Sequence, residues 1–151
     1  MKKNWSVSLL IGVALVSCDA TDPIAPPTSE QLAVSVQHRQ PGAGERVPTV
    51  RITAGEGTVT ISVTRPGLCA TLVDAGVSRG PRDLAVVARV SSNPAAQCAL
   101  ITSANVVDYS GTIASLPGGV YRVRVFEAEG SGQARLIGSA TVATTAHPIA
   151  L

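Results

Sequence analysis

The stretch Thr58-Val59-Thr60-Ile61-Ser62-Val63-Thr64 decides the fold class of this chain. Its apolar side chains, Val59, Ile61 and Val63, stand at every second position, and the four residues around them all carry hydroxyl groups. Successive side chains of a β-strand point to opposite faces of the sheet. The period of two therefore predicts a strand with one face in a core and the other in solvent.

The same period recurs on both sides of this stretch. Glycine-rich segments such as Ala54-Gly55-Glu56-Gly57 and Gly130-Ser131-Gly132 separate the runs, and short loops with glycine are typical of antiparallel hairpins. We find no run with the period of an amphipathic helix. We therefore expect an all-β, antiparallel sandwich of seven or eight strands. The other alternating runs are Leu32–Val36, Val50–Ile52, Leu84–Val90, Cys98–Leu100, Tyr109–Leu116, Tyr121–Val125 and Leu136–Val142.

A local pattern sharpens this expectation. The residues Leu116-Pro117-Gly118-Gly119-Val120-Tyr121-Arg122-Val123-Arg124-Val125 resemble the E–F corner of fibronectin type III and other immunoglobulin-like domains. In that corner a tyrosine hydroxyl bonds back to backbone a few residues upstream. The resemblance implies a structural tyrosine corner at Tyr121 and an immunoglobulin-like sandwich. The only tryptophan is Trp5, so the chain lacks the core tryptophan of antibody domains, and no specific family is implied.

The N-terminal segment is typical of an exported protein. Lys2 and Lys3 precede an apolar stretch of about a dozen residues, Trp5–Val16. A membrane-spanning helix needs about 20 apolar residues, so this stretch is typical of a signal peptide. Its end, Leu15-Val16-Ser17-Cys18, resembles the lipobox of bacterial lipoproteins. The resemblance implies cleavage before Cys18, lipidation of that cysteine and attachment to a bacterial membrane on its periplasmic or cell-surface side. The alternatives are a secretory peptide cleaved near Ala20 or Ala25, and an uncleaved anchor.

These features divide the chain into four parts. We expect a signal peptide at 1–17, the lipidated cysteine with a tether at 18–30, the sandwich at 31–146 and a short tail at 147–151. Pro23, Pro26 and Pro27 predict a semi-rigid, extended tether. The 134 residues that follow the signal peptide are enough for one domain with a hydrophobic core.

Composition excludes some classes of partner. Lys2 and Lys3 are the only lysines, so the chain from Cys18 onward carries ten arginines against ten carboxylates. This balance argues against a nucleic-acid partner, which requires a clustered basic surface. The same part of the chain has only three aromatic residues, Tyr109, Tyr121 and Phe126, which disfavours ligands that stack on aromatic platforms.

With Cys18 lipidated, Cys69 and Cys98 remain as a pair in an exported domain. A disulfide between them is the expectation for an oxidising compartment. Two free thiols and a metal pair are the alternatives. A metal site needs three or four converging ligands, and no histidine-rich stretch lies near either cysteine.

We find no catalytic motif and expect no metal, no cofactor and no enzymatic activity. The sequence holds no nucleophile elbow, zinc-protease motif or glycine-rich phosphate loop. His38 ends the first predicted strand, and His147 lies in the predicted tail. Asp74, Asp83 and Asp108 fall in or near predicted loops, and their scattered spacing favours solvated side chains over a calcium site.

Two further features have a functional and a structural interpretation. Arg122 and Arg124 share one face of a strand, with Arg51 or Arg89 as neighbours across the sheet. They form either a basic stripe for an anionic partner or a solvated face balanced by Glu127 and Glu129. The segment Ala70–Asp83 is predicted to be a long loop, which either binds a ligand or is ordinary surface.

The sequence therefore predicts a lipid-anchored exported protein whose domain is a binding or adhesion module of the cell envelope. Its partner is an envelope protein or a glycan. The alternative is a structural subunit that offers an exposed sheet edge to another envelope protein. A fold alone does not establish either function.

Overall fold

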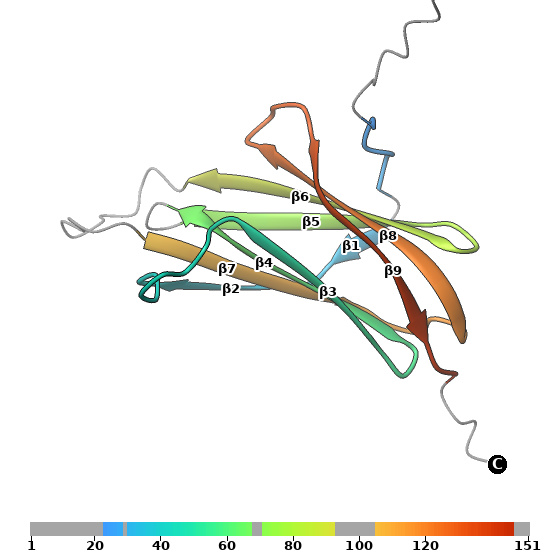
Figure 1. Cartoon of the computed structure of the whole chain (residues 1–151). Helices are drawn as coiled ribbons and strands as arrows, with labels where there is room; N and C mark the ends of the chain where they lie inside the picture. Colours follow the sequence, from blue (N-terminus) through green and yellow to red (C-terminus); the bar gives the residue numbers. More distant parts are fainter. Residues whose placement is uncertain (1–22, 29, 68–70, 93–104, 147–151) are drawn as a thin grey trace, which may run out of the picture.

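The computed structural model describes residues 23–28, 30–67, 71–92 and 105–146, and these residues form two β-sheets packed face to face (Figure 1). These residues form nine strands, whereas the sequence predicts seven or eight, and they contain no helix. The all-β prediction is therefore confirmed. The strands are β1 (Glu30–Leu32), β2 (Val34–Arg39), β3 (Thr49–Gly55), β4 (Thr58–Gly67), β5 (Thr71–Arg79), β6 (Asp83–Ser92), β7 (Asn105–Ile113), β8 (Gly119–Glu129) and β9 (Arg135–Thr144).

The strands divide between a five-stranded sheet A, in the order β1-β5-β6-β8-β9, and a four-stranded sheet B, in the order β2-β7-β4-β3. All pairs of neighbours are antiparallel except β6 and β8, which are parallel. The prediction of a wholly antiparallel sandwich is wrong at this pair. The physical reason is that β7, a strand of the opposite sheet, lies between them in the chain and returns the chain to the end where β6 began.

One edge of the sandwich is a strand that changes sheet. The sequence predicts a single strand through Leu32, Val34 and Val36, but β1 pairs with β5 in sheet A and β2 pairs with β7 in sheet B. Leu32 is buried over Gly111, where an added Cβ would lie 2.8 Å from its side chain. The glycine therefore makes room for the crossing from one sheet to the other.

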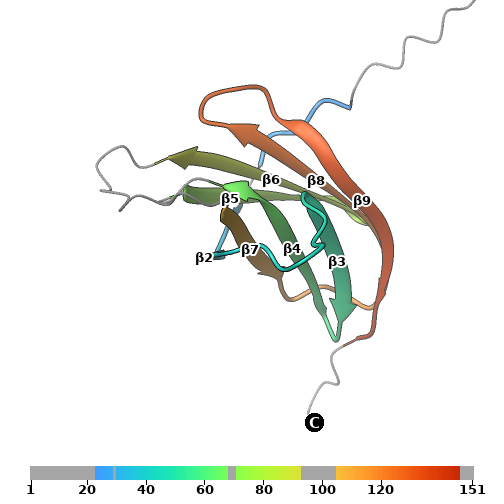
Figure 2. The same cartoon turned by 60° about the vertical axis from the view of Figure 1, so that its left-hand side comes forward.

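At the opposite edge β3 and β9 lie side by side (Figure 2). A Cβ at Gly138 would lie 2.8 Å from Val50, so the absence of a side chain there permits the close approach. The N–H of Gly57 in the β3–β4 turn donates a hydrogen bond of 2.9 Å to the carbonyl oxygen of Thr145. The two sheets are thus linked at both edges.

The core lies between the inner faces of the two sheets. Val59, Ile61 and Val63 of the stretch that decides the fold are almost fully buried, as the alternating pattern predicts. The segment 71–79 is strand β5 and not the predicted loop, and it buries Ala75 and Val77 in the same core. Within the described residues, no helix is long and apolar enough to cross a membrane.

Candidate binding surfaces

The corner before β8 has the hydrogen bond of a tyrosine corner. The hydroxyl of Tyr121 donates to the carbonyl oxygen of Pro117 at 2.9 Å, and its ring is almost fully buried. The guanidinium of Arg82 lies 5.2 Å from the ring centroid, over Gly119, whose φ of 144° and missing side chain admit it. The geometry is that of a structural anchor, because the hydroxyl and the ring are both occupied.

A cluster of charged side chains lies between the sheets. Tyr109 of β7 donates a hydrogen bond of 2.7 Å to Glu127 of β8, and Arg65 of β4 forms ion pairs with Glu127 at 2.8 Å and Glu129 at 2.9 Å. Burial, and then the bond to the Glu127 carboxylate, raise the pKa of Tyr109 well above its usual range. Arg65 and Glu127 are each 15 % exposed and Glu129 is 80 % exposed, so the cluster joins the sheets and only Glu129 stands open to solvent.

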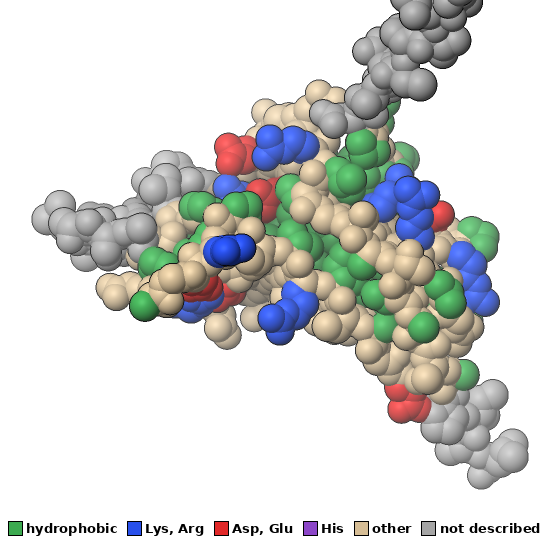
Figure 3. Space-filling view, viewed as in Figure 1, with side chains coloured by type: hydrophobic (Ala, Val, Ile, Leu, Met, Phe, Trp, Pro, Cys, Tyr) green, Lys and Arg blue, Asp and Glu red, His purple; other side chains and the backbone are tan. Residues whose placement is uncertain are grey.

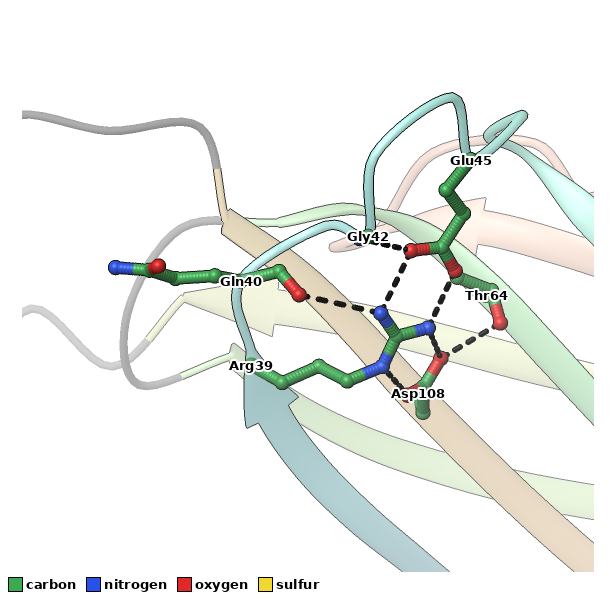
Figure 4. A network of polar contacts seen from close by, with 6 residues as sticks. All are labelled: Arg39, Gln40, Gly42, Glu45, Thr64 and Asp108. Atoms are coloured by element: carbon green, nitrogen blue, oxygen red, sulfur yellow. Dashed lines mark hydrogen bonds and ion pairs between the residues drawn. The ribbon is translucent and has the colours of Figure 1, made fainter.

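A second polar network lies on the outer face of sheet B, where β2, the β2–β3 loop, β4 and β7 meet (Figure 4). The guanidinium of Arg39, at the end of β2, binds Glu45 of the β2–β3 loop and Asp108 of β7. The backbone N–H of Gly42 also donates to Glu45 at 2.7 Å, and the hydroxyl of Thr64 donates to Asp108 at 2.6 Å.

These bonds stabilise the charged forms of the groups. The Arg39 guanidinium, followed by the N–H of Gly42, lowers the pKa of Glu45 to about 2. The same guanidinium and the hydroxyl of Thr64 lower the pKa of Asp108 below its usual range. In turn, hydrogen bonds to Glu45 and Asp108 raise the pKa of Arg39. The network therefore ties the β2–β3 loop to the sheet at neutral pH.

Beside this network, the outer face of sheet B forms a polar hollow of about 460 Å³. Strand register places Ser35, Ser110, Ser62 and Arg51 side by side across the four strands. In the next row on one side, the hydroxyls of Thr60 and Thr112 are hydrogen bonded at 3.0 Å. Arg51 is exposed and, among the described residues, forms no ion pair. The hollow offers hydroxyl groups, a fixed charged rim and a free guanidinium to a polar partner.

The outer face of sheet A differs because the N-terminal segment 23–28 lies on it. Ala25 packs against a small apolar cluster on this outer face, formed by Ala85, Val87 and Phe126. A Cβ at Gly76 would lie 2.5 Å from the hydroxyl of Thr28, so β5 accepts this segment only because it has no side chain there. At its C-terminal end, the predicted tether is therefore docked on the domain.

The arginines of the predicted basic stripe do not form one stripe. Arg122, Arg124 and Arg89 belong to sheet A, whereas Arg51 belongs to sheet B. Arg124 lies over the Phe126 ring and 3.7 Å from Asp83. Figure 3 shows arginine side chains spread over the surface, several of them beside acidic ones. The expectation that Arg51 lies beside Arg122 is wrong, because strand pairing assigns Arg51 to the other sheet. The alternative neighbour, Arg89, belongs to the same sheet as Arg122.

The structure also places the other predicted candidates. His38 accepts a hydrogen bond of 3.2 Å from the backbone N–H of Thr71 and so caps the start of β5. Asp74 and Asp108 lie within strands and not in loops, and Asp83 begins β6. Nowhere in the described part of the chain do three or more His, Cys, Asp or Glu side chains gather as a metal site would require. Cys18, Cys69, Cys98 and His147 lie outside the described residues.

Sequence reasoning missed both polar networks. Arg39 and Asp108 are 69 positions apart, and Arg65 and Glu127 are 62 apart. The only available signal was the presence of charged residues in or directly after apolar alternating runs. Glu127, which follows the run Tyr121–Val125, is an example. Comparisons of the chain with protein-family models, with curated proteins and with solved structures find no match.

Proposed function

We propose that the chain is an exported, lipid-anchored binding module of the bacterial cell envelope, with the outer face of sheet B as its binding surface. The observation that carries the proposal is the difference between the two outer faces. The N-terminal segment, which leads back to Cys18, covers part of sheet A. Sheet B has an uncovered polar hollow on its outer side, whereas the hollow on the outer side of sheet A is lined by the N-terminal segment itself. The outer face of sheet A thus suits attachment to the membrane through Cys18, and the outer face of sheet B suits binding of a partner.

The chemistry of the hollow suits a polar partner. Serine and threonine hydroxyls donate and accept hydrogen bonds, and the guanidinium of Arg51 adds five donors in a planar fork that matches a carboxylate or phosphate. A polar segment of an envelope protein and a glycan both offer the complementary groups. The Arg39 network adds rigidity, because it fixes the loop at the rim of the hollow.

An immunoglobulin-like type for the sandwich is also a proposal. Its support is the hydrogen bond of Tyr121 and the packing of two sheets. Constant-type immunoglobulin domains have the strand groups ABED and CFG, with antiparallel neighbours. Because β6 and β8 are parallel neighbours here, the proposed likeness is confined to the corner and the two-layer packing.

The alternative function is a structural subunit that pairs with another envelope protein by strand addition. A specific feature supports it, since β2 is the terminal strand of sheet B and, within the described residues, has no hydrogen-bonded strand on its other side. Its six residues alternate Val34 and Val36 with polar side chains and contain no proline. Unpaired edges of this kind are templates for another strand.

The anchor is tested by the intact mass of the protein from the membrane fraction. We expect a chain that begins at Cys18 and carries the mass of attached lipid. An unlipidated chain that begins beyond Cys18 would contradict membrane attachment and leave a freely secreted domain.

The binding surface is tested by photocrosslinking in intact cells. A photoreactive residue at Thr49, on the rim of the hollow, is compared with one at Thr141 on the outer face of sheet A. We expect protein or glycan adducts from Thr49 that Thr141 does not give. Adducts that require a probe at Val34 or Val36 of β2, and not at Thr49, would favour strand addition instead. Equal labelling from Thr49 and Thr141 would contradict a specific surface on sheet B.

A further inference from the structure

The N-terminal segment fixes how far the domain can move from a lipid on Cys18. Ala25 packs on the outer apolar cluster of sheet A, and Thr28 fills the space above Gly76. The contacts of this segment begin at Ala25, so only the chain from Cys18 to Ala25 lies between the lipid and the docked residues. Seven residues span about 24 Å when fully extended. This reach is much shorter than that of the whole predicted tether.

Such a short connection selects one face of the domain. The two sheets of a sandwich pack about 10 Å apart, and each outer face adds a layer of side chains. To lay sheet B on the membrane, the chain would have to pass from the outer face of sheet A around the sandwich. A connection of about 24 Å is too short for that path. The outer face of sheet A is therefore the face nearest the lipid.

The chemistry of this face agrees with the geometry. Strand register places Arg122 and Arg124 of β8 on the outer side of sheet A, beside Thr141 and Ser139 of β9. Arg122 is exposed and, within the described residues, makes no ion pair. Arg89 of β6 lies on the same face. The face therefore carries three arginines and two carboxylates, those of Asp74 and Asp83.

Exposed apolar side chains add to this surface. Among the described residues, Ile24 and Val120 are the two large hydrophobic side chains that stand out as exposed, at 79 % and 56 %. Ile24 belongs to the docked N-terminal segment, and Val120 lies on β8 two residues before Arg122. Arginine beside apolar side chains is suited to the boundary between anionic headgroups and acyl chains.

We infer that the outer face of sheet A is the membrane-facing side of the anchored protein, with Arg122 against anionic phospholipid headgroups. The inference rests on the proposed lipidation of Cys18. A single weak contact is enough, because the lipid keeps the face at a high effective concentration near the surface. In this orientation the polar hollow of sheet B points away from the membrane, toward soluble or surface-bound partners.

The test uses the full lipidated chain from the membrane fraction, bound to vesicles of phosphatidylethanolamine and phosphatidylglycerol. A fluorescent residue is introduced at Thr141 on sheet A or at Thr53 on sheet B, both exposed, and quenched by nitroxide-labelled headgroups. We expect several-fold stronger quenching at Thr141 than at Thr53. Arg122→Glu reduces the quenching at Thr141, whereas the matched sheet B variant Arg51→Glu leaves it unchanged. High salt acts like Arg122→Glu, because it screens exposed charges.

The outcomes separate the inference from the function on which it rests. If the intact mass shows no lipid on Cys18, the proposed anchor fails and the inference fails with it. If the chain is lipidated and bound but the two probes are quenched equally, or Thr53 more strongly, the orientation alone is wrong. If Arg122→Glu and Arg51→Glu have the same effect at Thr141, the arginines of sheet A do not contact headgroups.

Discussion

Tyr109 and Tyr121 bury similar rings in the core and differ in the groups that their hydroxyls bond. Tyr109 donates to the carboxylate of Glu127, and Tyr121 donates to a backbone carbonyl. Hydrogen bonds to charged groups contribute about 1.5–3 kcal/mol, and neutral ones about 1 kcal/mol. We expect Tyr109→Phe to lower the free energy of unfolding more than Tyr121→Phe, as measured by urea denaturation. A smaller loss for Tyr109→Phe would show that Arg65 alone satisfies Glu127.

The network around Arg39 predicts an acid-dependent stability. The pKa of Glu45 is lowered to about 2 and that of Asp108 is lowered as well. A lowered pKa contributes stability that is fully present above the unfolded value, near 4, and is lost as the pH falls toward the folded value. We expect Arg39→Gln to raise the pKa of Glu45 from about 2 toward its ordinary value of 4.5, while the remaining bond from the Gly42 N–H keeps it below that value; carboxyl-carbon NMR titration measures the change.

The matched control for this titration is Arg51→Gln, which removes an exposed arginine of the same sheet face. It leaves the guanidinium of Arg39 bound to Glu45 and Asp108, so neither pKa changes. A Glu45 titration that is the same in wild type and Arg39→Gln would mean that the ion pair is absent in solution.

At the residue scale, whether a contact is predictable depends on how far apart its two residues lie in the sequence. The tyrosine corner joins Tyr121 to Pro117, only four positions away, so its signature is contiguous in the sequence. The Arg39–Asp108 pair forms because β2 and β7 are neighbours in sheet B. Nothing local in the sequence specifies that neighbour relation, so this part of the candidate site was not predictable.

At the scale of elements, alternation identified strands but not their sheets. Leu32, Val34 and Val36 keep the same phase across the point where the chain passes from sheet A to sheet B. Leu32 in sheet A and Val34 and Val36 in sheet B all face the core between the sheets. The apolar residues therefore alternate without a break, as they would in a single strand. The apolar alternation of 73–77 was masked by Gly76 and Gly80, which are typical of loops. Gly76 instead serves to admit Thr28.

This role of Gly76 leads to a prediction about the N-terminal segment. We expect Gly76→Ala to displace Thr28, because the added Cβ would lie 2.5 Å from the threonine hydroxyl. The sandwich stays folded, while the backbone amides of Ile24, Ala25 and Thr28, the residues of this segment that are not proline, exchange faster with solvent, measured by hydrogen–deuterium exchange. Adding Thr28→Gly to Gly76→Ala removes the clash and restores part of the protection.

A matched control is Ser78→Ala, the next residue on the same outer face of β5. It changes the face without adding volume, and we expect the exchange of 23–28 to stay at the wild-type rate. If Gly76→Ala also leaves the exchange unchanged, the segment is not held above Gly76. The orientation inferred for the anchored protein would then lose its geometric basis.

At the scale of the whole molecule, the two sheets depend on close contacts at their edges. Gly138 of β9 faces Val50 of β3, where an added Cβ would lie 2.8 Å from the valine. Overpacking of a well-packed interior costs about 1–3 kcal/mol. We expect Gly138→Ala to lower the free energy of unfolding within this range, measured by urea denaturation. Because the two residues touch, we expect the double variant Gly138→Ala with Val50→Ala to lose less stability than the sum of the two single losses. An additive loss would show that the residues do not touch.

The predicted disulfide between Cys69 and Cys98 is the last feature at this scale. Both cysteines lie outside the described residues, but β5 and β6 bring their flanking chain together, because Thr71 pairs with Ser92. Cys69 lies two residues before Thr71, and Cys98 lies six residues after Ser92. Chain segments of this length are able to meet next to the paired strand ends. The fold is therefore compatible with the bridge that the cysteine count predicts.

A bridge there closes a loop of about 30 residues, which the chain-entropy relation values at roughly 3–4 kcal/mol. We expect the intact mass to rise by two hydrogens on reduction, and Cys69→Ser with Cys98→Ser to lower the free energy of unfolding by about that amount. Under reducing conditions the wild type and the double variant then become equally stable, because both lack the crosslink. If the mass does not change on reduction, the cysteines are free thiols. The sandwich then keeps its fold without a crosslink, through its buried inner faces, the Arg65–Glu127 cluster and the close contacts at its two edges.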